Sequence, residues 1–312
     1  MEPYDRNIIQ ALFVSSLETG NLFRWFSSMQ IKEVLVMKKS LFAIILLCMV
    51  ILFGCQPKEV GESVTLRIVD GAETGNLVLA GERTNDVYTL SAEGVTVYLD
   101  GEKANASVLE DGMKIDVVYS GEIQETYPAS FQDVKWIDAY SLGTEKNPGG
   151  TYYDLSGLYL NVLDDLWEKD SGLNDGAEYV SVDLSKAPGN LTEGEKAAIA
   201  WIFGSSHHVT PLMLSSEELA EQGYFTEISL SYMGKGNRQD ENERKNYQWE
   251  DGILFTITDN SVEGEIYSLP VVKFDAMKWR TPLGAYYFSN CSAVWPQMGT
   301  WSDYNVESEM IS

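Results

Sequence analysis

Residues 64–99 read VTLRIVDGAETGNLVLAGERTNDVYTLSAEGVTVYL and set the pattern of the first half of the chain. Short runs of β-branched, aliphatic and aromatic residues alternate there with turn signals such as Asp70-Gly71, which is typical of short strands joined by tight turns. The pattern predicts six strands, at residues 64–69, 77–80, 87–90, 95–99, 113–119 and 134–137. Because little room is left for helices, we expect a small barrel or sandwich over residues 63–140.

Two neighbouring segments of this region carry a family resemblance. Residues 111–117 read DGMKIDV and residues 121–129 read GEIQETYPA. The pair resembles part of an uncharacterised family of small Gram-positive lipoprotein domains, in which a G-M-x-V-x-V strand precedes a G-x-I-x-E-S-Y-P-A turn. Thr126 stands here in place of the serine. The resemblance covers the region from residue 60 to residue 140 and implies an OB-like β-barrel, but it brings no catalytic residue and no function with it.

The pattern changes after residues 141–151, which read SLGTEKNPGGT and have the Pro, Gly and polar content of a linker. Beyond this linker, apolar residues at helical spacing predict an amphipathic helix over residues 155–167. Two capping-box pairs predict the starts of two more helices, and they are Thr192 with Glu195 and Ser215 with Glu218.

Five further strands are expected in the second half, at residues 179–184, 226–232, 253–258, 266–274 and 283–288. Helices and strands mixed in this way predict an α+β domain over residues 152–312. The expected fold is therefore mainly β, with an OB-like β-barrel followed by an α+β domain.

The charge balance is strongly acidic. The chain has 22 Lys and Arg against 47 Asp and Glu, which gives a formal net charge of -25. Neutralising phosphate groups takes clustered Lys and Arg, so a nucleic-acid partner is excluded even though OB-like barrels often bind oligonucleotides. Cations, cationic peptides and neutral ligands remain open.

An export signal precedes the predicted barrel. Lys38 and Lys39 stand before the apolar run LFAIILLCMVILF at residues 41–53. The run is shorter than the roughly 17–25 residues that a spanning helix needs, so it indicates a signal peptide over residues 37–54. An uncleaved short anchor or a buried core helix is the alternative.

The end of this signal resembles the lipobox of bacterial lipoproteins. Residues 52–55 read LFGC, with Phe53 where Ala or Ser is usual. In that family the cysteine thiol receives a diacylglycerol and a peptidase cuts just before it. The resemblance implies that Cys55 is the lipidated N-terminus, that residues 55–62 are a tether, and that the membrane is a partner through this lipid. Two acyl chains give stable anchoring where one does not, so we expect the protein at the extracytoplasmic face of the cell membrane.

Residues 1–36 precede the predicted signal peptide, although a signal peptide normally begins with its charged segment. Met37-Lys38-Lys39 is such a beginning, and codons for Lys32-Glu33-Val34 can contain a purine-rich ribosome-binding sequence. We therefore interpret residues 1–36 as an untranslated leader and Met37 as the true start. A genuine cytoplasmic extension is the alternative.

The three cysteines are Cys48, Cys55 and Cys291. Cys48 lies inside the signal and Cys55 would be lipidated, so no intramolecular disulfide is expected. Cys291 lies in an aromatic neighbourhood and is interpreted as a small buried hydrophobic residue.

Candidate catalytic groups are few. His207 and His208 are the chain's two histidines, and neighbouring imidazoles lack the spacing of known zinc patterns. Ser205 and Ser206 stand beside them without the Gly-x-Ser-x-Gly elbow of a nucleophile. Residues 259–265 carry oxygen ligands that suit calcium, but they are equally typical of a turn between strands. No catalytic residue, metal or cofactor is therefore assigned.

Tryptophans gather in the C-terminal part, where Trp249, Trp295 and Trp301 are the candidates for a binding surface. Aromatic residues at strand spacing usually belong to a core, and that interpretation competes here with a surface role. Where exposed, such side chains can stack on sugar rings or hold a peptide.

These features together predict a lipid-anchored extracytoplasmic binding or interaction protein of the cell envelope. The alternative is a cell-envelope hydrolase that acts through the C-terminal domain, with acids and His207 or His208. A structural subunit of an envelope complex is a third possibility. An open groove lined with aromatic side chains favours binding, acids clustered around a histidine favour the hydrolase, and a flat apolar patch favours the complex.

Overall fold

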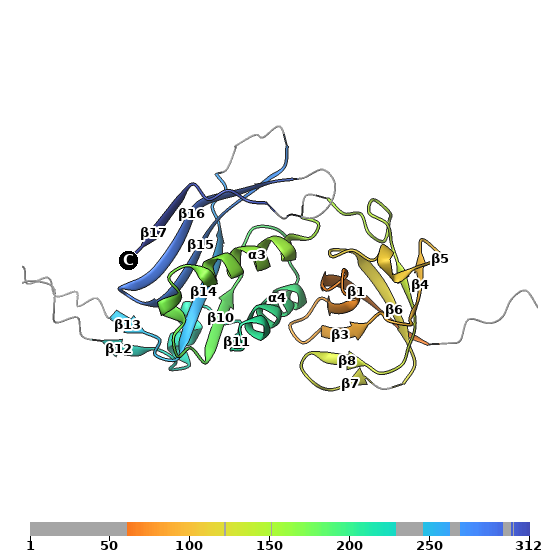
Figure 1. Cartoon of the computed structure of the whole chain (residues 1–312), viewed down its shortest axis with the longest axis horizontal. Helices are drawn as coiled ribbons and strands as arrows, with labels where there is room; N and C mark the ends of the chain where they lie inside the picture. The colour runs from red at the N-terminus through yellow and green to blue at the C-terminus, as the bar shows by residue number, and fades with distance from the viewer. Residues whose placement is uncertain are drawn as a thin grey trace, which may run out of the picture. The chain divides into compact units, whose positions relative to one another are not determined.

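Strands dominate the computed structural model (Figure 1). It describes residues 61–121, 123–150, 152–228, 246–262, 269–295, 301 and 303–312. Cys55, the signal peptide at 37–54, the leader at 1–36 and nearly all of the tether lie outside the described residues. The predictions made for them therefore stay predictions.

The first sheet has nine strands, in the order β5-β4-β9-β6-β1-β2-β3-β8-β7. Their bounds are β1 Glu62–Asp70, β2 Asn76–Ala80, β3 Val87–Ser91, β4 Thr96–Leu99, β5 Glu102–Ala104, β6 Lys114–Tyr119, β7 Ile123–Gln124, β8 Ala129–Phe131 and β9 Val134–Ala139. All six predicted strands are present. The three additional strands, β5, β7 and β8, are short, and a 3-10 helix, η1, covers Ala106–Val108.

The predicted OB-like barrel is corrected, because neither sheet of the described residues closes. β3 pairs in parallel with β8 at Tyr88 and Thr89. Because β8 occupies the free edge of β3, β3 cannot pair with β5 at the other end of the sheet to close a barrel. The sheet therefore ends at β5 on one side and at β7 on the other. It still encloses a core of aliphatic side chains, whose most buried members are Leu66, Ile68, Leu77, Leu79, Val97, Ile115, Val117 and Ile137.

The second sheet has six strands, in the order β11-β10-β14-β15-β16-β17. Their bounds are β10 Tyr179–Asp183, β11 Thr210–Leu212, β14 Gly252–Asp259, β15 Val271–Thr281, β16 Gly284–Val294 and β17 Ser308–Ile311. β10 is parallel to both β11 and β14, and the other pairs are antiparallel. β12 (Thr226–Ile228) and β13 (Asn246–Gln248) form a separate pair. This mixed arrangement agrees with the α+β prediction.

Three α-helices accompany these sheets in the described residues, namely α3 (Leu155–Glu168), α4 (Glu193–Ser206) and α5 (Ser216–Glu221), with a 3-10 helix, η2, at Ser171–Asn174. Both predicted capping boxes are confirmed, because Thr192 caps α4 and Ser215 caps α5 with reciprocal bonds to the glutamate three residues on. Within the described residues, every helix falls short of the length and apolarity that crossing a bilayer requires.

The helices α3 and α4 share one core with strands of both sheets. Val69, Val78 and Val87 of the first sheet pack in this core, together with Val180 and Phe255 of the second. The strands β1 and β2 are thus buried on both faces, because their alternate residues point into the first sheet's own core. The predicted domain boundary at residues 141–151 is not tested by this packing and stays a prediction.

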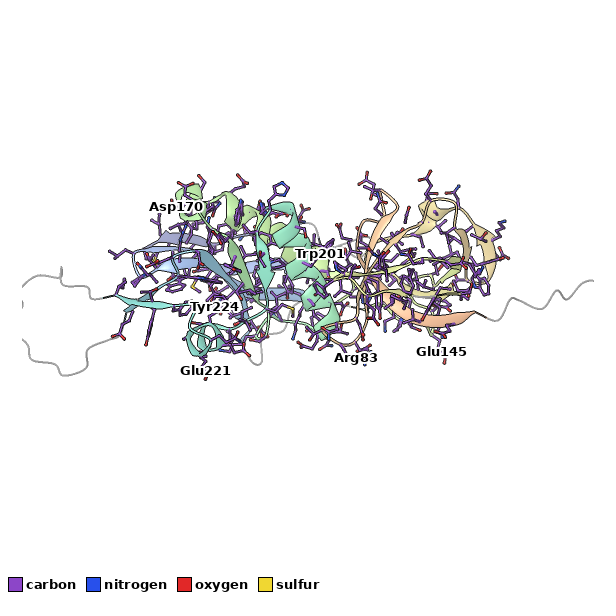
Figure 2. All side chains as sticks on the ribbon, turned by 90° about the horizontal axis from the view of Figure 1, so that it is seen from below. Arg83, Glu145, Asp170, Trp201, Glu221 and Tyr224 are labelled. Carbon is purple, nitrogen blue, oxygen red and sulfur yellow. The ribbon has the colours of Figure 1, made fainter. Side chains whose placement is uncertain are left out.

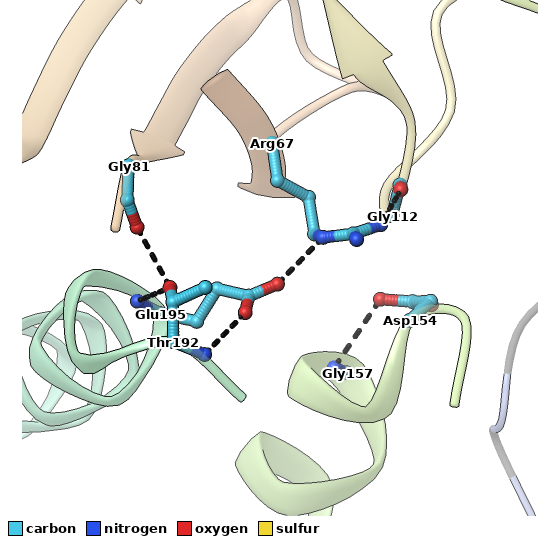
Figure 3. Close-up of polar contacts among 7 residues, drawn as sticks. All are labelled: Arg67, Gly81, Gly112, Asp154, Gly157, Thr192 and Glu195. Carbon is cyan, nitrogen blue, oxygen red and sulfur yellow. Dashed lines mark hydrogen bonds and ion pairs between the residues drawn. The ribbon is translucent and has the colours of Figure 1, made fainter. Parts of the chain in front are cut away.

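Polar contacts join the first sheet to the start of α4 (Figure 3). Arg67 Nε lies 2.6 Å from Glu195 Oε1, and Arg67 Nη1 donates to Gly112 O at 2.6 Å. The other oxygen of Glu195 accepts from Thr192 N at 2.7 Å, and Thr192 Oγ1 donates to Gly81 O at 2.7 Å. The capping box of α4 therefore also holds the helix against the first sheet.

Lys278 is a fully buried cation on β15. Its Nζ donates to the carbonyls of Trp167 at 3.0 Å and Lys169 at 2.7 Å, with Asp170 O at 3.4 Å. Burial lowers the pKa of Lys278 to about 8, so the ammonium is still protonated at neutral pH and can serve all three acceptors. The side chain thus satisfies the carbonyls that the end of α3 leaves unpaired.

Replacing Lys278 with methionine keeps the length of the side chain and removes its donors. We expect the free energy of unfolding to fall by about 2 kcal/mol, because the part-buried carbonyls of Lys169 and Asp170 lose a charged donor. Trp167 O keeps its bond from Asn174 Nδ2. Urea denaturation measures this loss, with Lys103→Met on the exposed strand β5 as the control. Equal stability of the two variants would show that Lys278 does not cap the helix.

Candidate functional site

Two cavities adjoin on the surface of the described unit, and Asn85 lines both of them. The larger has a volume of about 1040 Å³ and lies at one end of the first sheet. The smaller, of about 350 Å³, lies between the loop around Asn85 and the start of the second sheet. We call the larger one the polar cavity and the smaller one the aromatic groove.

The aromatic groove is built from five segments of the chain. α4 contributes Ala197, Ala200 and Trp201, and the segment from β11 onward contributes Pro211, Leu212, Met213 and Leu214. Thr84, Asn85 and Tyr127 come from the first half of the chain, and Gln222 and Tyr224 from the end of α5. Figure 2 labels Trp201 on α4 and Tyr224 after α5. None of the described residues of the lining is charged.

Three aromatic side chains in this groove are accessible. Tyr127 is 53% exposed, and Trp201 and Tyr224 are half-buried. The ring of Tyr224 makes edge-to-face contacts with the rings of Tyr179 and Trp249, at centroid distances of 6.0 and 5.7 Å. Ala197 and Ala200 of α4 line the groove together with Trp201. The groove thus offers fixed aromatic faces to a ligand.

The polar cavity is lined by amides, hydroxyls and two carboxylates. Tyr119 Oη donates to Glu62 Oε2 at 3.0 Å, and Gln132 Nε2 donates to Gln124 Oε1 at 3.2 Å. Glu125 is the second acidic residue of the lining. Among the described lining residues there is no Lys, Arg or His. Such a surface repels anions and suits neutral or cationic ligands.

Tyrosines also support the polar cavity. Tyr88 stacks on Phe131 and Tyr119 tilts against it, each at a centroid distance of 5.0 Å. Burial raises the pKa of Tyr88 and of Tyr119 above the usual range for a phenol, and the same holds for Tyr127 in the groove. These hydroxyls are therefore protonated at neutral pH and can donate hydrogen bonds.

The predicted tryptophan surface is corrected for two of its three members. Trp249 is 0% exposed and Trp301 is 1% exposed. Trp249 lies against Gly252, where any side chain would overlap its ring, and packs with Tyr224. Trp295 is half-buried and lies 5.2 Å from the ring of Trp301. None of the three lines the polar cavity or the aromatic groove, so the accessible aromatic site lies elsewhere.

The histidine pair is divided between two environments. His207 stacks on Trp167 at 4.3 Å between ring centroids, and its Nε2 lies 2.8 Å from Asp164 Oδ1. His208 is exposed and has a left-handed backbone. Ser206 Oγ donates to the carbonyl of Phe203 and is engaged by its own helix. His207 is therefore a partly buried side chain held between the Trp167 ring and the Asp164 carboxylate.

In the part of the chain that the structure describes, no three His, Cys, Asp or Glu side chains are placed so that they could hold a metal ion. In the predicted turn after β14, Asp259 Oδ1 accepts from Ser261 N at 2.7 Å, which is an Asx-turn. Residues 263–265 of that segment lie outside the described residues. Cys291 is confirmed as a buried free cysteine, and burial raises its pKa to about 12.

Comparison with known proteins adds no assignment, because no family model, characterised protein or solved structure matches this chain. The resemblance to small Gram-positive lipoprotein domains therefore stays a prediction. The geometry of the two cavities is the evidence on which a function can be argued.

Proposed function

We propose that this chain is a lipid-anchored extracytoplasmic binding protein of the cell envelope, and that its ligand occupies the aromatic groove and the polar cavity. The observation that carries the proposal is the set of accessible aromatic side chains at Tyr127, Trp201 and Tyr224, next to a cavity lined by amides, hydroxyls and two carboxylates. Concave sites of this composition, with aromatic walls and a few polar groups, are typical of ligand recognition.

The arrangement of acids and histidines favours binding over the alternative hydrolase. His207 and its partner Asp164 line neither cavity, and Trp167 covers one face of the imidazole. The carboxylates that do line the polar cavity are Glu62 and Glu125. Glu62 already accepts a hydrogen bond from Tyr119, as expected of an acid that orders a binding surface.

The proposed anchor would hold the site close to the membrane. Glu62 is both the first residue of β1 and part of the polar cavity. The eight residues from Cys55 to Glu62 are joined by seven Cα-to-Cα steps, which span at most about 25 Å when fully extended. A lipid on Cys55 would therefore keep the ligand within a short distance of the bilayer, where membrane-proximal polymers of the envelope lie.

Replacing Cys55 with alanine is expected to release the protein from the membrane, because the thiol that accepts the diacylglycerol is lost. Detergent phase partitioning and intact-mass analysis measure the release. Cys48→Ala is the matched control, since it changes a cysteine inside the signal and should leave a lipidated chain that starts at Cys55. A Cys55→Ala protein that still partitions wholly with the membrane contradicts the proposed anchor.

Binding through the groove is tested by retention on purified Gram-positive cell walls. Trp201→Ala and Tyr127→Ala are each expected to lower the affinity for the cell walls about tenfold, because the loss of an aromatic anchor costs about 1–2 kcal/mol of binding free energy. Tyr152→Ala is the control, because Tyr152 is 46% exposed and lines neither cavity. Retention that all three variants leave unchanged contradicts a binding role for the groove.

A further inference from the structure

We propose that the ligand of this site is an uncharged oligosaccharide that carries acetamido groups. The inference rests on the proposed function and adds the chemical class of the ligand. Its starting point is the absence of any cation among the described lining residues, together with the formal net charge of -25. An anionic ligand, such as a phosphate-bearing polymer, would meet repulsion without a compensating contact.

The polar groups that line the two cavities suit sugar hydroxyls and amides. Asn85, Gln124, Gln132 and Gln222 each present both a donor and an acceptor on a planar group. Gln132 and Gln124 are already held by a mutual hydrogen bond, which fixes the orientation of both. Hydroxyl-rich ligands need donors and acceptors in equal measure, and amide side chains supply them without charge.

Asn85 stands where the two cavities meet. On one side of it lies the apolar floor of Ala197, Ala200 and Met213, and on the other lies the polar cavity. An acetamido group combines a methyl with an amide, so it can place the methyl on the apolar floor while the amide pairs with Asn85. The accessible rings of Trp201 and Tyr127 can stack on the apolar faces of the sugars.

An extended peptide fits this site less well. β11 is the edge strand of the second sheet and lines the groove, and Pro211 stands at its centre. Proline has no N–H, so this edge cannot form a regular ladder with an added strand. At the other cavity the edge strand β7 has only two residues. An extended peptide commonly binds by adding a strand to a sheet edge through main-chain hydrogen bonds. This mode of binding is therefore blocked at both cavities.

Three tetrasaccharides with the same β-1,4-linked backbone test the inference, because they differ only at carbon 2. N-acetylchitotetraose carries acetamido groups there, cellotetraose carries hydroxyls, and the deacetylated chitosan tetramer carries ammonium groups. Calorimetric titration of the full chain, in a detergent without a sugar headgroup, is expected to give binding of N-acetylchitotetraose at least tenfold tighter than of cellotetraose. Asn85→Ala should remove most of that difference.

Several outcomes overturn the inference. Equal affinity for N-acetylchitotetraose and cellotetraose removes the acetamido preference, and tightest binding of the chitosan tetramer assigns the site to a cation. Tighter binding of penta-lysine than of any sugar assigns it to a cationic peptide. Where no tetrasaccharide binds but Trp201→Ala still lowers retention on cell walls, the proposed binding function stands and the ligand class is wrong.

Discussion

The variant Arg67→Met is expected to lower the free energy of unfolding by about 3 kcal/mol, because it leaves a buried carboxylate without its cation. The ion pair joins β1 to α4, and the Glu195 side chain is only 6% exposed. Without Arg67 the carboxylate keeps its bond to Thr192 N but loses its cation in a buried place. The carbonyl of Gly112 loses a donor at the same time.

Urea denaturation at pH 7 measures this effect, and Arg83→Met is the matched control. Arg83 also pairs with an acid, Asp86, but its own side chain is 83% exposed. Exposed pairs contribute about 0–1 kcal/mol, so the control should change little. The double variant Arg67→Met with Glu195→Gln should recover part of the loss, because the unpaired charge is gone. An Arg67→Met protein as stable as the control contradicts the role of this pair.

Asp154→Asn is expected to raise stability, and only at high pH. Asp154 is 3% exposed and caps α3 through Gly157 N at 3.4 Å. Burial, and after it the charge of Asp111, raise its pKa to about 7, while Arg67 opposes the shift. The native state therefore holds the proton more tightly than the unfolded state. The stabilisation by the protonated form is complete below about pH 4 and is lost as the pH rises through 7.

Asparagine keeps the shape, the capping oxygen and the tolerance of the left-handed backbone at this position. At pH 8 the variant should be more stable than the native chain by about 4 kcal/mol, and near pH 4 the difference should nearly vanish. Urea denaturation at both pH values checks this. Asp133→Asn is the control, since hydrogen bonds from Ser120 and Lys135 lower the pKa of that exposed acid and no gain is expected. A gain at pH 8 that persists at pH 4 contradicts the linkage.

Local sequence patterns predicted individual helices and strands more successfully than they predicted whether the first sheet closes into a barrel. The alternation of residues 64–69 and the capping box at Thr192 are encoded within a few residues, and both appear as predicted. Whether a sheet closes depends on which edges meet. The parallel pairing of β3 with β8 is made by a strand of three residues that no periodicity reveals, and it leaves the expected barrel open.

The candidate site was missed for a related reason. Trp201 lies in a segment whose apolar residues predict a buried helix, and the sequence pattern does not distinguish the one ring that borders a groove from those that face the core. Tyr127 comes from a turn more than 70 residues earlier, so only the tertiary fold brings the two near one cavity. Trp249 and Trp301 were candidates for a binding surface in competition with a core role, and the structure buries both of their rings in the interior.

The central claim is that the ligand enters where the two cavities meet, and a label at Asn85 tests it without knowledge of the ligand. Asn85 is exposed and lines both cavities, whereas Cys291 is fully buried. Cys48 and Cys55 are replaced by alanine and serine in both labelled variants, so that neither competes for a maleimide. The measurement is retention of Asn85→Cys on purified cell walls before and after coupling to a bulky maleimide, with Lys103→Cys on β5 as the control. The account predicts that coupling lowers retention of Asn85→Cys at least tenfold and leaves the control unchanged. Equal retention of the two coupled proteins would contradict it.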